Sequence, residues 1–445
     1  MKNFSGIFFS LTIILICFGC SNDTLGIVIP EKKIDIQFVK TLGGSHNESA
    51  RSVVKTLDGG YAILGFTQSI DGDISTTKGN VQYDLWLLKF DAQDNLLWQK
   101  TFGGTKDDYG YKIIQATDGG YVIVGSSKSD DFDQSTNFGF EDVWVLKLDA
   151  AGSYEWKSTI GFAGTDVGYS VIQTADGGYF VGSVLDVTAS GGQGNSKNAQ
   201  WKHAGGDYWG IKLSKTGSTE WRKYFGGKNT DTCYDVVEAT DGFIMIGSSD
   251  SNDVDINNSK GSYDFWIVKT DKQGTLVWEK SFGGSEIDEA FQIVKTTDNN
   301  FLIVGETRSS DQNVTNQKGG ADIWVVKMDT NGAIIWQKNY GGTSFDVGRG
   351  VALAQDGGFY LSGSTRSMDG DVTENKGSND VWILKIDESG NLEWQKTIGG
   401  SDIDFSYDVV ELNDKSLIIV GESNSKDQQI PINKGFSDAL IVKMK

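Results

Sequence analysis

A chain of 445 residues is too long for one ordinary layered core unless that core is modular. The chain has 57 Gly, only 2 Pro and 13 Trp, a composition typical of a globular protein rich in tight turns. Its net charge of -20, with no Lys/Arg cluster, excludes a nucleic-acid-binding surface.

The N-terminal segment has the pattern of an export signal. Lys2 is followed by an apolar run from Ile7 to Phe18. Because a membrane helix needs about 20 apolar residues, this run is short for a membrane span and typical of a signal-peptide core. We therefore predict a signal peptide over residues 1–19.

The junction Gly19-Cys20, followed by polar residues, resembles a bacterial lipoprotein signal, in which the cysteine is acylated. The resemblance implies a lipid on Cys20, a flexible tether over residues 20–33, and location at the bacterial outer membrane, on its periplasmic or cell-surface side. The alternative is a plain secretory signal in which Cys20 is incidental. Cys233 would then be the one cysteine of the folded body, so we expect no disulfide there.

Seven copies of one unit fill the chain from Ile34 to its end, over residues 34–445. The stretch "WQKTFGGTKDDYGYKIIQATDGGYVIVGSS" recurs as "WQKNYGGTSFDVGRGVALAQDGGFYLSGST". A glycine after an aromatic segment marks each copy, at Gly43, Gly103, Gly161, Gly226, Gly283, Gly341 and Gly399. Repeats of this length indicate a solenoid or a propeller.

Each unit contains four short strand signals. In the second unit they cover Tyr111–Thr117, Tyr121–Ser127, Asp142–Asp149 and Ser153–Ile160. Alternating β-branched and aromatic residues between Gly, Asp and Asn indicate strands and turns, and no segment has a helical period. Four strands in seven units predict an all-β, seven-bladed β-propeller with antiparallel blades.

The last unit lacks its fourth strand. The N-terminal segment "IDIQFVKTL", starting at Ile34, has the pattern of that strand. We therefore predict that the ring is closed by the N-terminal strand, which removes an exposed sheet edge.

Twelve of the tryptophans recur with the repeat. Six stand two residues after an Asp of the third strand and six more stand 12 residues later. We predict that they pack between blades, as opposed to stacking on sugars. They are Trp86, Trp144, Trp209, Trp266, Trp324 and Trp382, then Trp98, Trp156, Trp221, Trp278, Trp336 and Trp394.

The units resemble the bacterial beta-propeller repeat family. The resemblance covers residues 34–445, and it rests in the second unit on Trp98, Gly103, Gly104, Asp108, Gly119, Tyr121, Gly125, Asp142, Lys147, Asp149 and Gly152. It implies the propeller fold and an extracytoplasmic location, and it implies no activity.

Two acidic positions recur in all seven units, which favours architecture over catalysis. The first, after the double glycine, is interpreted as a turn cap, with a cation or sugar site as the alternative. It comprises Glu48, Asp108, Asp166, Asp231, Asp288, Asp346 and Asp404. The second opens the third strand and is followed by Lys five residues later. It comprises Asp84, Asp142, Asp207, Asp264, Asp322, Asp380 and Asp438.

Four loops between second and third strands share Asp-x-Asp, at Asp71/Asp73, Asp131/Asp133, Asp253/Asp255 and Asp369/Asp371. Their spacing differs from the twelve-residue calcium loop. We interpret them as polar loop turns, with calcium as the alternative. No cofactor is otherwise expected.

The third unit carries the longest such loop, from Leu185 to Trp209. It holds Trp201 and His203, the one irregular tryptophan beside one of two histidines. An exposed aromatic side chain on a propeller loop is a recognition candidate, so we predict a ligand site at Trp201 and His203. The alternative is an insertion whose tryptophan packs on its own blade.

Catalytic motifs are absent from the sequence: there is no G-x-S-x-G, no H-E-x-x-H and no phosphate loop. We therefore predict no catalytic residues, and a monomeric, lipid-anchored binding or scaffold module for a protein or surface partner, which would dock on an acidic loop face. The alternative is a lectin or a glycan-active enzyme at the cell surface.

Overall fold

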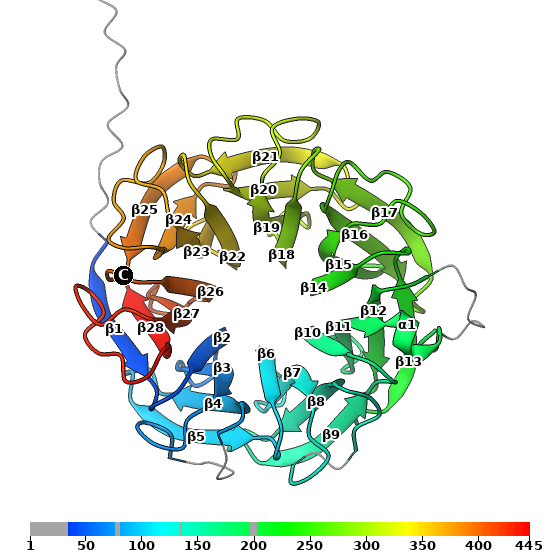
Figure 1. The fold of residues 1–445 in the computed structure, drawn as a ribbon, viewed down its shortest axis with the longest axis horizontal. Coiled ribbons are helices and arrows are strands. Elements are labelled where there is room, and N and C mark those ends of the chain that lie inside the picture. Colours follow the sequence, from blue (N-terminus) through cyan, green and yellow to red (C-terminus); the bar gives the residue numbers. More distant parts are fainter. Residues whose placement is uncertain (1–33, 76–80, 134–135, 196–202) are drawn as a thin grey trace, which may run out of the picture. The chain divides into compact units, whose positions relative to one another are not determined.

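A computed structural model of the protein describes residues 34–75, 81–133, 136–195 and 203–445. These residues form seven antiparallel sheets of four strands each, arranged as blades around a central axis (Figure 1). The predicted all-β, seven-bladed β-propeller is confirmed. Cys20 and the segments predicted as signal peptide and tether lie outside the described residues.

The blades are numbered by their innermost strands. From blade 1 to blade 7 these are β2 (Glu48–Lys55), β6 (Asp108–Gln115), β10 (Val167–Gln173), β14 (Asp231–Ala239), β18 (Asp288–Lys295), β22 (Asp346–Leu353) and β26 (Asp404–Glu411). The second strands are β3 (Tyr61–Thr67), β7 (Tyr121–Ser127), β11 (Tyr179–Asp186), β15 (Gly242–Ser249), β19 (Phe301–Thr307), β23 (Phe359–Thr365) and β27 (Leu417–Ser423).

The outer half of each blade follows the same order. The third strands are β4 (Asp84–Phe90), β8 (Asp142–Leu148), β12 (Gly206–Leu213), β16 (Asp264–Asp271), β20 (Asp322–Met328), β24 (Asp380–Ile386) and β28 (Asp438–Met444). The fourth strands are β5 (Leu96–Phe102), β9 (Tyr154–Ile160), β13 (Thr219–Phe225), β17 (Leu276–Phe282), β21 (Ile334–Tyr340), β25 (Leu392–Ile398) and β1 (Ile36–Leu42). One short helix, α1 (Val187–Ser190), lies in the long loop of blade 3.

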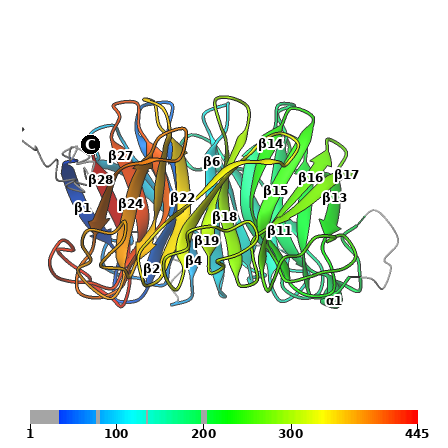
Figure 2. The same cartoon turned by 90° about the horizontal axis from the view of Figure 1, so that it is seen from above.

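The N-terminal strand closes the ring, as predicted. β1 pairs antiparallel with β28, from Leu42 opposite Ala439 to Ile36 opposite Met444. Blade 7 therefore has the strand order β1-β28-β27-β26. Figure 2 shows β1 beside β28 at one edge of the ring, and blade 7 has four strands like the other six blades.

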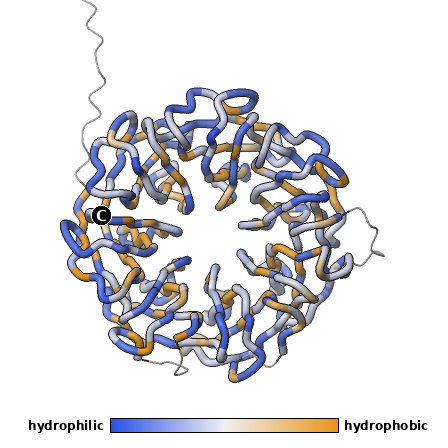
Figure 3. The backbone as a smooth tube through the Cα atoms, viewed as in Figure 1, coloured by the Kyte–Doolittle hydropathy of each residue, from blue (hydrophilic) through white to orange (hydrophobic). Residues whose placement is uncertain are grey.

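Buried apolar side chains fill the space within and between blades. Figure 3 shows hydrophilic segments in the loops at the outer rim. The third-strand tryptophans, such as Trp144 at 0% exposure, are fully buried. The fourth-strand tryptophans cover the next blade: Gly152, in the turn of blade 2, lies against the ring of Trp98 in blade 1. The prediction that these tryptophans pack between blades is confirmed.

The innermost strands differ from the prediction in one respect. In blade 2 the strand starts at Asp108, three residues before the predicted start at Tyr111. The cause is a β-bulge: Gly110 pairs with Gly125 and Lys112 pairs with Val124, so that Tyr111 has no partner. An unpaired residue breaks the alternation on which the sequence-based boundary depended.

Candidate functional site

The first recurrent carboxylate is part of the blade scaffold. In blade 2 one oxygen of Asp108 accepts the N–H of Gly104 at 2.7 Å, and the other accepts the hydroxyl of Ser127. The equivalent side chain in every blade is 0–1% exposed and accepts a backbone N–H of the preceding loop. These bonds are those of a turn cap, the interpretation favoured from the sequence.

The third-strand carboxylate lies beside the first carboxylate of the next blade. A side chain on Gly283 would collide with Asp264 and Asp288 together, so the first glycine of the double glycine leaves room for both. Burial, reinforced by the charge of Asp288, raises the pKa of Asp264 to about 6. We call these sets the carboxyl pairs: Asp84/Asp108, Asp142/Asp166, Asp207/Asp231, Asp264/Asp288, Asp322/Asp346, Asp380/Asp404 and Asp438/Glu48.

The lysine five residues after the third-strand Asp is also structural. The side chain of Lys147 is 2% exposed, and its Nζ lies 2.9 Å from the carboxylate of Asp118 in the turn between β6 and β7. Six blades have this ion pair with their own turn. In blade 7, Lys443 pairs with Asp94 of blade 1. A buried ammonium group needs such a partner, which explains why this lysine recurs together with an aspartate in the turn after the innermost strand.

The Asp-x-Asp loops hold neighbouring loops together. Asp71 accepts the N–H of Ser45 at 2.8 Å, and Asp73 accepts the N–H of Gly43 at 3.0 Å. Blade 5 makes the second bond with Asn313, which is uncharged. These contacts match polar loop turns. Among the described residues, no group of three or more His, Cys, Asp or Glu side chains is placed to hold a metal ion.

Of the two predicted ligand-site residues, Trp201 lies outside the described residues, and His203 lies against its own blade. Nδ1 of His203 is 2.8 Å from Oδ2 of Asp207, and its ring meets Tyr224 edge-on at 5.0 Å. Burial lowers the pKa of His203, but the contact with Asp207 and nearby carboxylates outweigh it, so the pKa is raised overall. In blade 5 the equivalent carboxylate, Asp322, accepts the backbone N–H of Lys318. In blade 3 the imidazole of His203 takes the place of that backbone donor beside Asp207.

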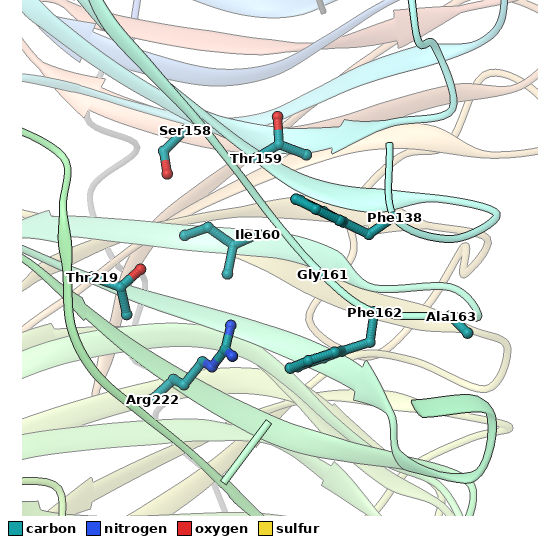
Figure 4. Close-up of a pocket in the computed structure, with 9 residues that line it drawn as sticks. All are labelled: Phe138, Ser158, Thr159, Ile160, Gly161, Phe162, Ala163, Thr219 and Arg222. Atoms are coloured by element: carbon teal, nitrogen blue, oxygen red, sulfur yellow. The ribbon is translucent and has the colours of Figure 1, made fainter. Parts of the chain in front are cut away.

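A cavity of about 430 Å³ lies between blades 2 and 3. Figure 4 shows Phe138 and Phe162 on either side of it, with Arg222 directed toward Phe162. We call it the blade 2–3 groove; its lining residues are Phe138, Ser158, Thr159, Ile160, Gly161, Phe162, Ala163, Thr219 and Arg222.

Arg222 is the chemically distinctive side chain of the groove. Its guanidinium carbon lies 4.6 Å from the ring centre of Phe162 and 5.9 Å from that of Trp209. Within the described part of the chain it has no carboxylate within ion-pair distance. Burial lowers its pKa. A guanidinium against aromatic faces keeps its charge and its donors available to a ligand.

The groove is also where the repeat breaks. Gln99, Gln337 and Gln395 stand at the position of Arg222 in blades 1, 5 and 6, and each accepts the indole N–H of its third-strand tryptophan. In blade 3 the indole of Trp209 donates instead to the carbonyl of Gly194, at 2.9 Å.

Phe162 is a second break, because the other six units have glycine there. Aligning the seven units column by column would have revealed both positions from the sequence.

Exposed aromatic side chains extend the groove outward. Phe138 is 56% exposed and Phe140 is 67% exposed, both on the loop between β7 and β8. Such rings facing water are typical of contact surfaces. The groove therefore combines a cation, hydroxyl groups and apolar rings.

The comparisons with known proteins identify no family for the chain. No protein-family model matches the chain. An uncharacterized WD repeat-containing protein of Acanthamoeba polyphaga mimivirus is 22% identical over 81% of this chain, which corresponds to 32% of that protein. The regulatory protein FlaEY of Caulobacter vibrioides is 23% identical over 43% of this chain and 22% of its own length.

The chain therefore spans about a third of the first relative and about a fifth of the second. Among solved structures, the extracellular domains of Drosophila Semaphorin 1b have a TM-score of 0.48 at 9% identity, over 93% of this chain and 87% of that one. Over the described residues, no helix is long and apolar enough to cross a bilayer.

Proposed function

We propose that the propeller is a non-enzymatic binding module, held outside the cytoplasm by a lipid on Cys20, and that an acidic segment of a protein partner docks in the blade 2–3 groove. The supporting observation is Arg222, a guanidinium without an ion-pair partner in the described residues, in a hollow where the repeat departs from itself. The recurrent carboxylates are buried in the scaffold and do not face a hollow of this kind.

Charge and shape together favour this partner. A carboxylate that binds a half-buried guanidinium gains charge-assisted, bidentate hydrogen bonds. Phe138 offers apolar surface to a neighbouring side chain of the same partner, in the way that interface anchors do. Because the chain has a net charge of -20, most of its surface repels an acidic partner, which would therefore bind only where a cation such as Arg222 stands.

The test is the substitution Arg222→Gln, which restores the residue that blades 1, 5 and 6 carry. We expect it to weaken binding of a labelled peptide of alternating Glu and Leu by about 2 kcal/mol, measured by fluorescence anisotropy. The free energy of unfolding should change by less than about 1 kcal/mol, because no ion pair is lost.

The matched control is Arg366→Gln, which removes the same charge from an exposed loop position in blade 6. It should leave binding unchanged. A photo-reactive phenylalanine at position 138 should then cross-link the natural partner in an Arg222-dependent way. Equal binding by wild type and Arg222→Gln would show that the groove is not the docking site.

Two further measurements examine the rest of the proposal. Cys20→Ala should release the protein from the membrane fraction, and unchanged fractionation would argue against the lipid. A glycan array with a reducing-sugar assay on the same polysaccharides tests the rival class: binding without turnover would indicate a lectin, and turnover would indicate an enzyme.

A further inference from the structure

In each blade the β-bulge of the innermost strand leaves one side chain directed at the central axis. The bulge residue has no partner on the second strand, as Arg51 does between the pairs Ala50–Gly65 and Ser52–Leu64. All seven bulge residues line one cavity of about 90 Å³. We call them the axial ring: Arg51, Tyr111, Tyr169, Tyr234, Phe291, Arg349 and Tyr407.

Aromatic contacts run through the ring from blade to blade. The centroids of Tyr111 and Tyr169 are 5.1 Å apart, those of Tyr169 and Tyr234 are 5.3 Å apart, and those of Tyr234 and Phe291 are 5.3 Å apart. The guanidinium of Arg349 lies 3.6 Å from the centre of the Phe291 ring. This geometry holds the rings and the guanidinium as one wall around the axis.

The residues that follow the bulges form a polar floor in which two carboxylates, Asp235 and Asp408, share the one ammonium group of Lys112. Asp408 accepts the hydroxyl of Ser52 at 3.0 Å and lies 3.7 Å from Nζ of Lys112. Asp235 accepts the N–H of Ile293 at 3.0 Å. Burial lowers the pKa of Lys112, but Asp408 and Asp235 outweigh it and raise the pKa overall. The hydrogen bonds of the floor are satisfied internally, so it needs no ligand.

The two arginines of the wall are compensated to different degrees, because Arg51 pairs with Glu422 whereas Arg349 only interacts with the charge of Glu289. Within the described residues Arg349 has no ion pair and no side-chain hydrogen bond. Arg51 lies 3.5 Å from one oxygen of Glu422, and its buried Nε has no hydrogen-bond partner. The two residues belong to blades 6 and 1, on either side of Tyr407 in blade 7. The chain has five arginines in all, so two on one axis are a marked concentration.

We propose that the axial ring binds a small carboxylate carried on a six-membered ring. The carboxylate would take the donors of Arg349, because a planar guanidinium matches a carboxylate with two parallel hydrogen bonds, and Arg51, which pairs with Glu422, would add its positive charge. The carboxylate would occupy the cavity, and the ring of the ligand would lie at its mouth beside the tyrosine rings of blades 2 to 4, because the two guanidinium groups already cover Phe291 and Tyr407. The chemistry fits an aromatic acid or a uronic acid, and the experiment separates the two.

The test uses benzoate and glucuronate with the full folded protein in isothermal titration calorimetry. Benzyl alcohol and glucose serve as neutral analogues, and benzylamine as a cationic one. We expect at least one of the two acids to bind about ten- to hundred-fold more tightly than its neutral analogue. Preference for benzoate identifies an aromatic acid, and preference for glucuronate identifies a sugar acid.

The variant Arg349→Gln should bind the preferred acid about ten- to hundred-fold more weakly than the wild type. Arg222→Gln in the groove and Arg366→Gln in a loop should bind the acid as the wild type does. Arg349→Lys keeps the charge without the planar donors, and it should give an intermediate affinity if Arg349→Gln proves unstable. Equal affinity for benzoate and benzylamine, or full affinity in both Arg349 variants, would overturn the proposal. Because the groove is a separate site, either proposal can fail while the other stands.

Discussion

Two carboxyl groups lie side by side at every blade boundary, and their protonation links the stability of the ring to pH. Burial, with the charge of Asp142, raises the pKa of Asp166 to about 7. Burial, partly offset by His203, raises the pKa of Asp207 to about 7. An unfolded Asp titrates near pH 3.9, roughly. The native protein therefore holds more protons than the unfolded chain between these values.

We predict that the melting temperature rises as the pH falls from 8 to 5. A group with a raised native pKa stabilises the fold below its unfolded pKa, and that contribution is lost as the pH rises through the native pKa. Circular dichroism melts at half-unit pH steps measure the slope. A melting temperature that falls steadily from pH 8 to pH 5 would contradict the prediction.

The variant Asp264→Asn supplies the control for this pH dependence. An amide oxygen still accepts the N–H of Lys260, at 2.5 Å in the native protein, but the group no longer titrates. The pH slope should therefore become shallower in this variant while the propeller stays folded.

At the scale of the strand, sequence reasoning succeeded where side chains alternate and failed where a bulge interrupts them. The strand β7 agrees with its predicted bounds, Tyr121–Ser127, because a buried central strand follows simple β-branched patterning. The axial ring was missed because Arg51 and its equivalents differ chemically from blade to blade. A signal was present: a lone glycine inside the second strand, such as Gly125, indicates a bulge opposite it.

The candidate sites show the same division. Repetition identified the recurrent carboxylates as scaffold, and the structure gives the first carboxylate of every blade a backbone N–H, whereas third-strand carboxylates such as Asp264 and Asp322 keep one buried oxygen without a hydrogen-bond partner among the described residues. The groove depends on Phe162, which replaces a constant glycine, and on Arg222, which stands at a variable position, and their neighbours come from two blades that become adjacent only when the ring forms. Sequence periodicity describes what the blades share, and so it passes over such contacts.

The substitution Gly125→Ala should disrupt the bulge of blade 2. A Cβ at this position would overlap the carbonyl oxygen of Tyr109, and the strand would have to separate or lose Tyr111 from the ring. We expect a loss of about 3 kcal/mol or more in urea unfolding, in the range for severe steric strain.

Gly119→Ala is the matched comparison for Gly125→Ala. Its φ of 86° disfavours alanine, yet nothing lies within 4 Å of the added Cβ. That variant should lose only about 1 kcal/mol. Equal losses in the two variants would show that backbone preference, and not the bulge contact, sets the cost.

At the scale of the whole ring, the one cysteine in the described residues, Cys233, is free and buried, so no disulfide there ties the first and last blades together. The stability of the ring therefore depends on the pairing of strands that closes it. Deleting residues 21–42 removes β1 and its ladder with β28, whereas deleting residues 21–32 leaves that ladder intact. We expect the longer deletion to cost several kcal/mol more, from lost backbone hydrogen bonds and from exposure of the β28 edge. Calorimetry of both truncations measures the difference, and equal melting temperatures would contradict the importance of closure.

The seam between β1 and β28 also has a consequence for biosynthesis. β1 leaves the ribosome before every other strand of the propeller, yet its partner is the last strand to be made, about 400 residues later. At roughly 5 to 20 residues per second, its edge waits roughly 20 to 80 seconds for that partner. In the finished ring, Asp35 and Lys445 exchange two backbone hydrogen bonds of 3.0 Å each, so the two ends of the ring are neighbours. A circular permutant that joins them by a short linker and opens the chain between blades 3 and 4 would make its strands in the order in which they pair, and would shorten that wait to the synthesis of the linker and one strand.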